Sequence, residues 1–275
     1  TLKDAFRRAY ACRAAPGAGV VACTGPGGLP GPGDYILETI GGTNLEFGDG
    51  PSTPTLFYVV DAINVAGNWL QGRALNPGTV STAIPHTYAN PGPWTARIDS
   101  CCRTGVEVNN PNSAYRVEAI VNLNAGNTAN PVSILPAIVH CPFPAVCSFF
   151  IPRVDGDGNA ITFRFSTSVE SSGGAGFTQP GPPDAPNAAS ITGATGAYSW
   201  NTAGAAGGVG ALYSTQVTME EKNAAGAVIG KSAIDFLIQL ISGNPPVFNV
   251  PPTPPAGTNF GVQPGGNVNF TVQAS

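Results

Sequence analysis

The sequence divides into short runs in which apolar and polar residues alternate, separated by clusters of glycine, proline and asparagine. Six runs fit half-buried strands: LFYVVDAI, WTARIDSC, YRVEAIVNL, ITFRFST, YSTQVTM and AIDFLIQLI. No window of twelve or more residues has a convincing helical period. Because parallel strands need crossover helices, the pattern predicts an all-β fold of tandem antiparallel β-sandwiches with an extended C-terminal strand.

The N-terminal segment, residues 1–33, is compatible with two structures. In LKDAFRRAYACRA, Leu2, Phe6 and Tyr10 recur every fourth residue, as on one face of a helix. As a strand, the same segment alternates less well, although a strand contributed to another molecule's sheet would accept this pattern. We therefore expect a segment that is either stapled by disulfides or donated as a strand.

Proline and glycine clusters divide the rest of the chain into three parts. Residues 34–130 and 131–243 each contain a set of predicted strands, joined through NPVSILPAIV. The stretch SGNPPVFNVPPTPPAG has too many prolines to lie inside a sheet, so residues 244–275 are predicted to form an extended connector followed by a strand.

The last residues, NVNFTVQAS, alternate as a strand with one buried face. A lone strand with an open edge is unstable in water, so we expect that the chain was cut here or that another molecule completes the sheet. Stiffness of the run Pro251 to Pro255 would hinder insertion into the strand's own domain. The residues predicted to join subunits are Phe260, Val262, Val268, Phe270 and Val272.

The composition excludes several classes of partner. Charged residues make up 10% of the chain and the net charge is -4, with no basic run, which argues against a nucleic-acid partner. No apolar stretch reaches the roughly 18 residues of a membrane span. Because Thr1 is neither an initiator methionine nor part of a signal peptide, we expect a processed or excised chain. A surface with so few charges repels its neighbours weakly and favours association.

Six cysteines without zinc-like CxxC pairs predict disulfides and an extracellular or cell-surface location. Cys141 and Cys147 flank a short loop and are expected to pair. Adjacent cysteines point to opposite faces of a strand, so Cys101 and Cys102 are predicted to find different partners, with Cys12 and Cys23 as the candidates. The competing assignment is a Cys12–Cys23 bridge with a vicinal disulfide.

One loop contains candidate metal ligands. Asp155 and Asp157 in VDGDGN offer carboxylate oxygens, which Ca²⁺ prefers, but the loop lacks the acidic residue that completes an EF-hand. The favoured alternative is a hairpin turn built from aspartate and glycine. Ca²⁺ is the only cofactor suggested. Acidic residues elsewhere in the sequence that offer further carboxylate ligands are Glu170, Asp184, Glu220 and Glu221.

Catalytic patterns are weak. His140 precedes Cys141, but neighbouring side chains diverge on a strand and this cysteine is expected to be oxidised. His86 lies in a turn motif, where local packing is the favoured role. The chain has no G-x-S-x-G elbow, P-loop or HExxH motif, so it is not expected to be an enzyme.

The first unit contains the motif F-G-D-G at residues 47–50 and the motif H-T-Y at residues 86–88. With these motifs it resembles the PKD-type repeat, an immunoglobulin-like sandwich of extracellular proteins. Phe47–Gly50 forms F-G-D-G, and His86–Tyr88, Gly92 and Trp94 fill the later H-T-Y motif, at a longer spacing than is usual. The glycines can take positive φ, and Asp49 can bond the amides of its own turn. The resemblance implies a structural motif.

The second unit contains a D-x-D-G turn at residues 155–158 and a G-x-x-x-W strand at residues 196–200. With these motifs it resembles the cadherin-like or putative immunoglobulin repeats of bacterial surface proteins. Its D-x-D-G turn contains Asp155, Asp157 and Gly158, and its G-x-x-x-W strand contains Gly196 and Trp200. In that family the turn opens a hairpin and a later alternating pair closes the sandwich. The tail reads like the start of another such repeat.

The sequence therefore predicts the structural subunit of an extracellular filament or surface array. Copies of the chain would form a head-to-tail homopolymer by β-strand complementation. The alternatives are a fragment of a multi-repeat cell-surface adhesin and a polysaccharide-binding module. For the last, Trp69 is the candidate glycan contact, because Trp94 and Trp200 lie in alternating strands and are expected to be buried.

Overall fold

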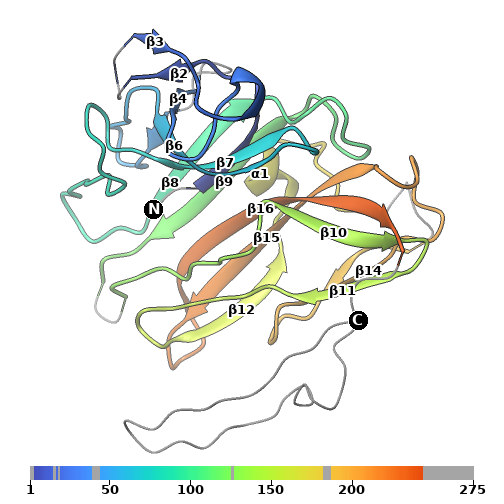
Figure 1. Cartoon of the computed structure of the whole chain (residues 1–275). Coiled ribbons are helices and arrows are strands. Elements are labelled where there is room, and N and C mark those ends of the chain that lie inside the picture. Colours follow the sequence, from blue (N-terminus) through green and yellow to red (C-terminus); the bar gives the residue numbers. More distant parts are fainter. Residues whose placement is uncertain are drawn as a thin grey trace, which may run out of the picture.

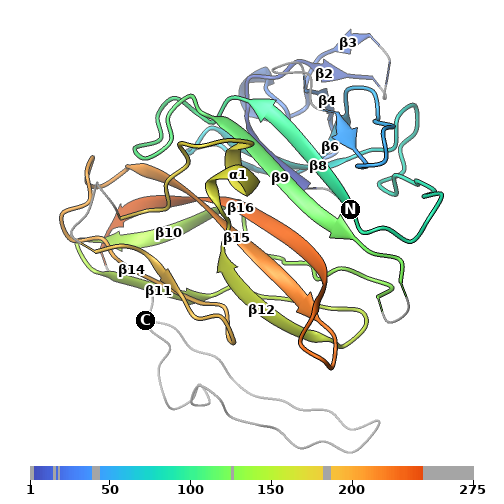
Figure 2. The same cartoon turned by 180° about the vertical axis from the view of Figure 1, so that it is seen from behind.

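A computed structural model describes residues 3–14, 17, 19–38, 44–124, 127–181 and 187–243, with only the backbone described for residues 3–7. The regular elements of the described chain are almost all strands, which are arranged in three sheets (Figures 1 and 2). The elements are β1 (Lys3–Arg7), β2 (Cys12–Arg13), β3 (Val20–Val21), η1 (Pro26–Gly28), β4 (Tyr35–Leu37), β5 (Leu45–Glu46), β6 (Phe57–Asn64), β7 (Trp69–Ala74), β8 (Trp94–Cys101), β9 (Ala114–Val121), β10 (Ile138–Phe143), β11 (Val146–Phe150), β12 (Ala160–Phe165), α1 (Ser168–Ser172), β13 (Ser190–Ile191), β14 (Ala197–Asn201), β15 (Leu212–Lys222) and β16 (Val228–Ser242).

The predicted all-β class with antiparallel sheets is confirmed. The six alternating runs of the sequence correspond to β6, β8, β9, β12, β15 and β16. All paired strands in the described residues are antiparallel except β10 and β16. The connector and the predicted joining strand, residues 244–275, lie outside the described residues.

The N-terminal segment forms a strand of its own protomer's sheet. The six-stranded sheet has the order β1-β7-β6-β4-β2-β3, and β1 pairs with β7 from Lys3 opposite Arg73 to Arg7 opposite Trp69. Without β1, the strand β7 would present an open edge, so this pairing satisfies backbone groups that a helix would leave unpaired. The helical alternative for this segment is therefore wrong.

The seven-stranded sheet contains strands from both sides of the predicted boundary at residue 130. Its order is β12-β15-β16-β9-β8-β5, and β10 adds to β16 in parallel. The fifteen-residue β16 is long enough to pair with two partners: Lys231 and Ser232 lie opposite β9, whereas the half from Leu237 onward lies opposite β10. The predicted division at residue 130 is therefore not a division between sheets.

The three-stranded sheet β11-β14-β13 closes a sandwich with the β12-β15-β16-β10 part of the larger sheet (Figure 1). Trp200 of β14 is 1% exposed, which confirms its predicted burial, and its ring contacts Tyr213 edge-on at 4.8 Å between centroids. The buried apolar residues of this core are Cys141, Cys147, Ile151, Ile161, Phe163, Tyr198, Trp200, Ala205, Tyr213, Val217, Met219, Phe236, Ile238 and Leu240.

A second core lies under the six-stranded sheet and includes Ile98 of β8. Its buried members are Ile36, Leu56, Tyr58, Val60, Leu70, Ala74 and Ile98. Within the seven-stranded sheet, a largely buried ion pair joins the end of β8 to β16. Arg103, which follows β8, donates to Asp235 of β16 and to the carbonyl of Ser171, and its guanidinium lies 4.7 Å from the ring centroid of Phe177.

Candidate functional site

The turn that contains Asp155 and Asp157 lies between β11 and β12. Asp155 accepts a 2.8 Å bond from the amide of Asn159 through Oδ2, and Gly158 has a φ of 71°, which a glycine adopts without strain. Asp157 accepts bonds from the amides of Thr128 (2.7 Å) and Ala129 (2.9 Å) and from the Thr128 hydroxyl. The predicted aspartate turn is thus present, and it also holds the chain that leads from β9 to β10.

Glu221 of β15 is the third carboxylate of this group. β15 pairs with β12, and Glu221 lies opposite Ile161, close to the turn that precedes β12. Its side chain is completely buried, and its Oε1 accepts a 2.6 Å bond from the side-chain amide of Asn159. One carboxylate oxygen each from Asp155, Asp157 and Glu221 lie within 4.8 Å of one another. The structure therefore brings together the two predicted ligands and one of the four further acidic residues.

The other three acidic residues do not join this group. Glu220 and Glu170 lie on the opposite face of the sheet, where both bind Arg164. Asp184 lies outside the described residues. Sequence reasoning could not choose Glu221 over Glu220, because that choice depends on which face of β15 meets the Asp155 turn.

The electrostatic environment of Glu221 disfavours its charged form. Burial raises the pKa of Glu221, and the nearby charges of Asp155 and Asp157 raise it further, although the bond from Asn159 opposes this shift. The hydrogen bonds from Thr128 and Ala129 instead lower the pKa of Asp157. Among the described residues, no lysine, arginine or histidine forms a salt bridge with any of the three.

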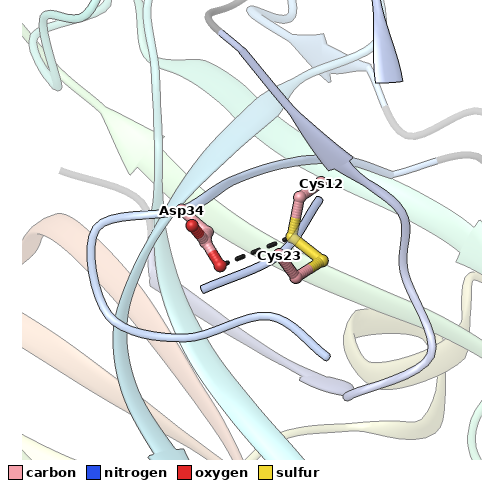
Figure 3. Close-up of side chains that lie close together, drawn as sticks. All are labelled: Cys12, Cys23 and Asp34. Carbon is pink, nitrogen blue, oxygen red and sulfur yellow. Dashed lines mark hydrogen bonds between the residues drawn. A yellow bond between two sulfur atoms is a disulfide. The ribbon is translucent and has the colours of Figure 1, made fainter. Parts of the chain in front are cut away.

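A second group of ligand-type residues lies near the N-terminus, where Figure 3 shows Cys12, Cys23 and Asp34 close together. Cys12 and Cys23 form a disulfide, so neither sulfur is a thiolate ligand for a metal. Asp34 Oδ2 lies 3.5 Å from Cys12 Sγ and accepts bonds from the amides of Thr24 and Gly31 at 2.8 and 2.9 Å. This group therefore organises the N-terminal loop.

The disulfide pairing follows the competing assignment of the sequence analysis. Cys12–Cys23 and the vicinal Cys101–Cys102 bridge are present, so the favoured pairing between these two sets of cysteines is wrong. The physical reason is local: Cys12 lies opposite Val21 in the β2–β3 hairpin, which brings the Cα atoms of Cys12 and Cys23 to 5.3 Å. The expected Cys141–Cys147 bridge is present, with its Cα atoms 5.2 Å apart.

The motif residues of the first unit form a structural cluster. His86 stacks on Phe47 with 3.9 Å between ring centroids, and its Nε2 lies 2.9 Å from Asp49 Oδ2. Gly48 has a φ of 92°, and a Cβ there would lie 2.5 Å from the carbonyl oxygen of Thr95. A side chain at this position is excluded by both the backbone conformation and the close approach of β8. His86 thus has the packing role that the sequence analysis favoured.

The tryptophans differ from one another in burial. Trp94 is only half-buried and therefore does not have the core position expected for it. Its Nε1 donates to the carbonyl of Asn90, and its ring stacks against Tyr88. Trp69 is also half-buried and lines a cavity of about 990 Å³ between the six-stranded and seven-stranded sheets. Polar side chains on this cavity include those of Arg13, Gln71 and Arg97.

The predicted joining residues Phe260, Val262, Val268, Phe270 and Val272 lie outside the described residues. A candidate acceptor edge is described, however. β11 is the outer strand of the three-stranded sheet, and its Val146 and Phe150 are 60% and 69% exposed. The sequence analysis had not selected this strand, although its alternation of Val146, Ser148 and Phe150 is visible in the sequence.

The pair His140 and Cys141 does not form a nucleophile and its base. Cys141 is bonded to Cys147 and therefore offers no thiolate to His140. In the described part of the chain, no helix is both long and apolar enough to cross a membrane. The three disulfides fit the predicted extracellular location.

Comparison with known proteins gives one family match. Residues 1–124 match the model of the family described as integrin beta-like protein A-E, N-terminal. The PKD-type assignment of the first unit stays a prediction. No curated protein gives a significant match.

Two solved structures are similar at low identity. The protocadherin GammaB4 extracellular domain is 12% identical over 93% of this chain, with a TM-score of 0.27, and the chain spans 36% of that structure. The two tandem V-type regions of VCBP3, a v-region-containing chitin binding protein, are 11% identical over 87% of this chain and 100% of that one, with a TM-score of 0.33. TM-scores this low do not establish a shared fold. The chain is thus similar to the integrin beta-like family over its N-terminal 124 residues.

Proposed function

We propose that the protein is a non-enzymatic extracellular module that joins copies of itself head to tail by β-strand complementation. The observation that carries the proposal is the edge of β11, a strand with one paired side and exposed apolar side chains. Unpaired strand edges are templates for another chain, and proteins usually protect them with charges, prolines or covering loops. β11 has no charged residue and no proline.

The backbone geometry of β11 favours an added strand. The carbonyl of Ala145 accepts from the amide of Thr202, and the amide of Ile151 donates to Gly196. In an antiparallel pair these contacts alternate along the strand, so the polar backbone groups of Val146, Ser148 and Phe150 point away from β14. An incoming strand would satisfy these backbone groups, and its alternate side chains would supply specificity.

The proposed donor is the segment 260–272 of a neighbouring copy. In it Val268, Phe270 and Val272 alternate with polar residues, which is the pattern that matches a strand with one buried face. The proline-rich connector before it supports intermolecular joining, since a stiff linker disfavours return to the same protomer. The family match adds support of another kind, because its printed name, integrin beta-like, suggests an adhesive role.

The test removes each side of the joint separately. Deletion of residues 244–275 should leave a folded monomer in sedimentation velocity, whereas the full chain should form larger species. Val146→Lys in the full chain should have the same effect, because a charge on the edge opposes strand addition. The matched control is Val80→Lys, since Val80 is 65% exposed and lies in the loop between β7 and β8, outside the three-stranded sheet. Polymers that survive both the deletion and Val146→Lys would contradict the proposal and favour the fragment of a multi-repeat adhesin.

A second candidate function is polysaccharide binding in the cavity that Trp69 lines. An aromatic face beside polar side chains is a common arrangement for contacts with ligands that have one apolar face. Trp69→Ala should abolish binding on a glycan array, whereas Trp94→Ala, which changes a half-buried tryptophan not on the cavity, should leave it unchanged. Absence of any glycan signal for the full chain would remove this candidate.

A further inference from the structure

We propose that Asp155, Asp157 and Glu221 form a Ca²⁺ site that ties the segment between β9 and β10 to the second sandwich. This inference goes beyond the proposed joint, because none of its residues lies on β11 or in the tail. It also differs from the expectation for the loop alone, since the third carboxylate, that of Glu221, comes from β15.

The first observation is the convergence of three carboxylates. Oxygens from Asp155, Asp157 and Glu221 lie within 4.8 Å of one another, a spacing that oxygens around one Ca²⁺ can have when each lies about 2.3–2.6 Å from the ion. Acidic residues gather at many protein surfaces without a ligand. The convergence alone therefore does not define a site.

The second observation concerns unsatisfied buried oxygens. Glu221 is completely buried, and its Oε2 has no hydrogen-bond partner. Asp155 Oδ1 is also buried and without a partner. A buried carboxylate oxygen that has lost its water and found no donor is costly. Two carboxylates of the same group each have one such oxygen, and a bound cation would compensate for this cost.

The residue opposite Glu221 is Gly230, and its missing side chain lets Glu221 Oε2, Asn130 Oδ1 and Asn127 Nδ2 lie close to its backbone. A Cβ on Gly230 would lie 2.7 Å from Glu221 Oε2 and 2.6 Å from Asn130 Oδ1. Both oxygens thus occupy the volume that a side chain would take. Asn130 also donates its amide to the carbonyls of Ile120 and Lys231, an orientation that leaves Oδ1 as the atom facing the glycine.

The donor set favours Ca²⁺ over other divalent cations. All the candidate donors are carboxylate or amide oxygens, without histidine or thiolate, which argues against Zn²⁺ and Cu²⁺. Ca²⁺ accepts irregular arrangements of six to eight oxygens, whereas Mg²⁺ requires a near-ideal octahedron and keeps several waters. Three carboxylates supply enough charge to bind a divalent ion at the concentrations found outside cells.

Binding at this place would stiffen the junction between the two units. Asp157 already holds Thr128 and Ala129, and the side-chain amide of Asn127 donates to the carbonyl of Ile229. The ion would add a fixed point between this segment, the Asp155 turn and the β15–β16 pair. We therefore expect Ca²⁺ to change the stability of the junction more than that of the six-stranded sheet.

The test uses the full chain, first freed of metal by EGTA and dialysis. Titration with CaCl₂ in a calorimeter should give saturable heat with a Kd of about 10⁻⁴ to 10⁻³ M. Ca²⁺ should also raise the melting temperature more than Mg²⁺ does at the same concentration. Glu221→Gln should weaken binding by roughly tenfold or more, because it removes the buried charged ligand. Glu220→Gln is the matched control and should bind as the wild type does, since Glu220 faces Arg164.

Two further measurements keep the proposal falsifiable. If Glu221→Gln lacks the wild-type circular dichroism spectrum, Asp155→Asn in the adjacent turn gives the same test. Limited proteolysis between residues 122 and 137 should slow when Ca²⁺ is added to the wild type but not to Glu221→Gln. Absence of heat and of a thermal shift in the wild type at about 10 mM CaCl₂, or equal affinity in wild type and Glu221→Gln, would overturn the site.

Discussion

Glu220 and Glu221 are neighbours in β15, yet their surroundings are opposite. Glu220 faces Arg164 at 2.7 Å and Lys231 at 4.0 Å, and Glu170 shares both cations. Glu221 points to the other face, where it meets two aspartates and no cation among the described residues. Adjacent side chains of a strand point to opposite faces, so two identical residues can have opposite environments. The environment of Glu220 favours its charged form, whereas that of Glu221 disfavours it.

The largest expected effect concerns Glu107, another buried carboxylate with an unpartnered oxygen. Burial raises its pKa to about 7 in the folded protein, although Arg103 opposes the shift. The folded state therefore binds more protons than the unfolded state between about pH 4.5 and 7, so this group's contribution to stability falls as the pH rises through that range.

Glu107→Gln should remove that slope and stabilise the protein at pH 8 by up to about 3 kcal/mol. Urea unfolding of both proteins at pH 5 and pH 8 checks this prediction. If the variant is no more stable than the wild type at pH 8, the charged form of Glu107 does not destabilise the folded protein, and the prediction is wrong.

The next effect concerns the face of β15 on which Glu220 and Glu170 bind Arg164. Burial raises the pKa of Glu170, but the bidentate bonds from Arg164 and the bonds from Thr167 outweigh it and hold the pKa at about 2. This carboxylate stabilises the fold above its unfolded pKa, and the contribution is lost as the pH falls toward 2.

Arg164→Met should destabilise the protein by about 2 kcal/mol at pH 7, since it leaves two partly buried carboxylates without their shared donor. The difference from wild type should shrink between pH 4.5 and pH 2.5, as measured by chemical unfolding. A constant difference across that range would exclude Glu170 as its source.

The smallest effect gives the sharpest comparison, because it predicts opposite signs at adjacent positions. In Ca²⁺-free buffer at pH 7, Glu221→Gln should stabilise the fold by about 1 kcal/mol, since it removes repulsion from two aspartates and adds a donor. Glu220→Gln should destabilise it by about 1 kcal/mol, because a neutral amide loses the charge attraction to Arg164. Equal signs would mean that the two faces of β15 do not differ as described.

Much of the fold could be predicted from local patterns, because period-two alternation reports directly on a half-buried strand. The sequence did not reveal the partner choice of β16, since nothing in its fifteen residues marks the point where the pairing changes from β9 to β10. The predicted pairing of Cys12 and Cys23 with Cys101 and Cys102 was wrong for a related reason. The β2–β3 hairpin that joins Cys12 to Cys23 is too short to leave a clear strand signal.

The candidate cation site was only partly predictable. Asp155 and Asp157 are close in sequence and share a recognisable turn, so they could be selected together. Glu221 follows them by more than sixty residues and could not be distinguished from Glu220 without the register of β12 against β15. Likewise, the alternation in β11 was visible, but its position at a sheet edge depends on pairing with β14.

The most direct test of the strand joint is cysteine capture between two copies. Chains carrying Val146→Cys are mixed under oxidising conditions with chains carrying one of three substitutions: Val268→Cys, Phe270→Cys or Val272→Cys. All chains keep the six native cysteines. We expect a disulfide-linked pair containing one chain of each kind for at least one of the three positions, and no such product when Val80→Cys replaces Val146→Cys. If no tail position captures Val146→Cys, or if all of them capture Val80→Cys equally well, the proposed contact between the tail and β11 of the next copy is contradicted.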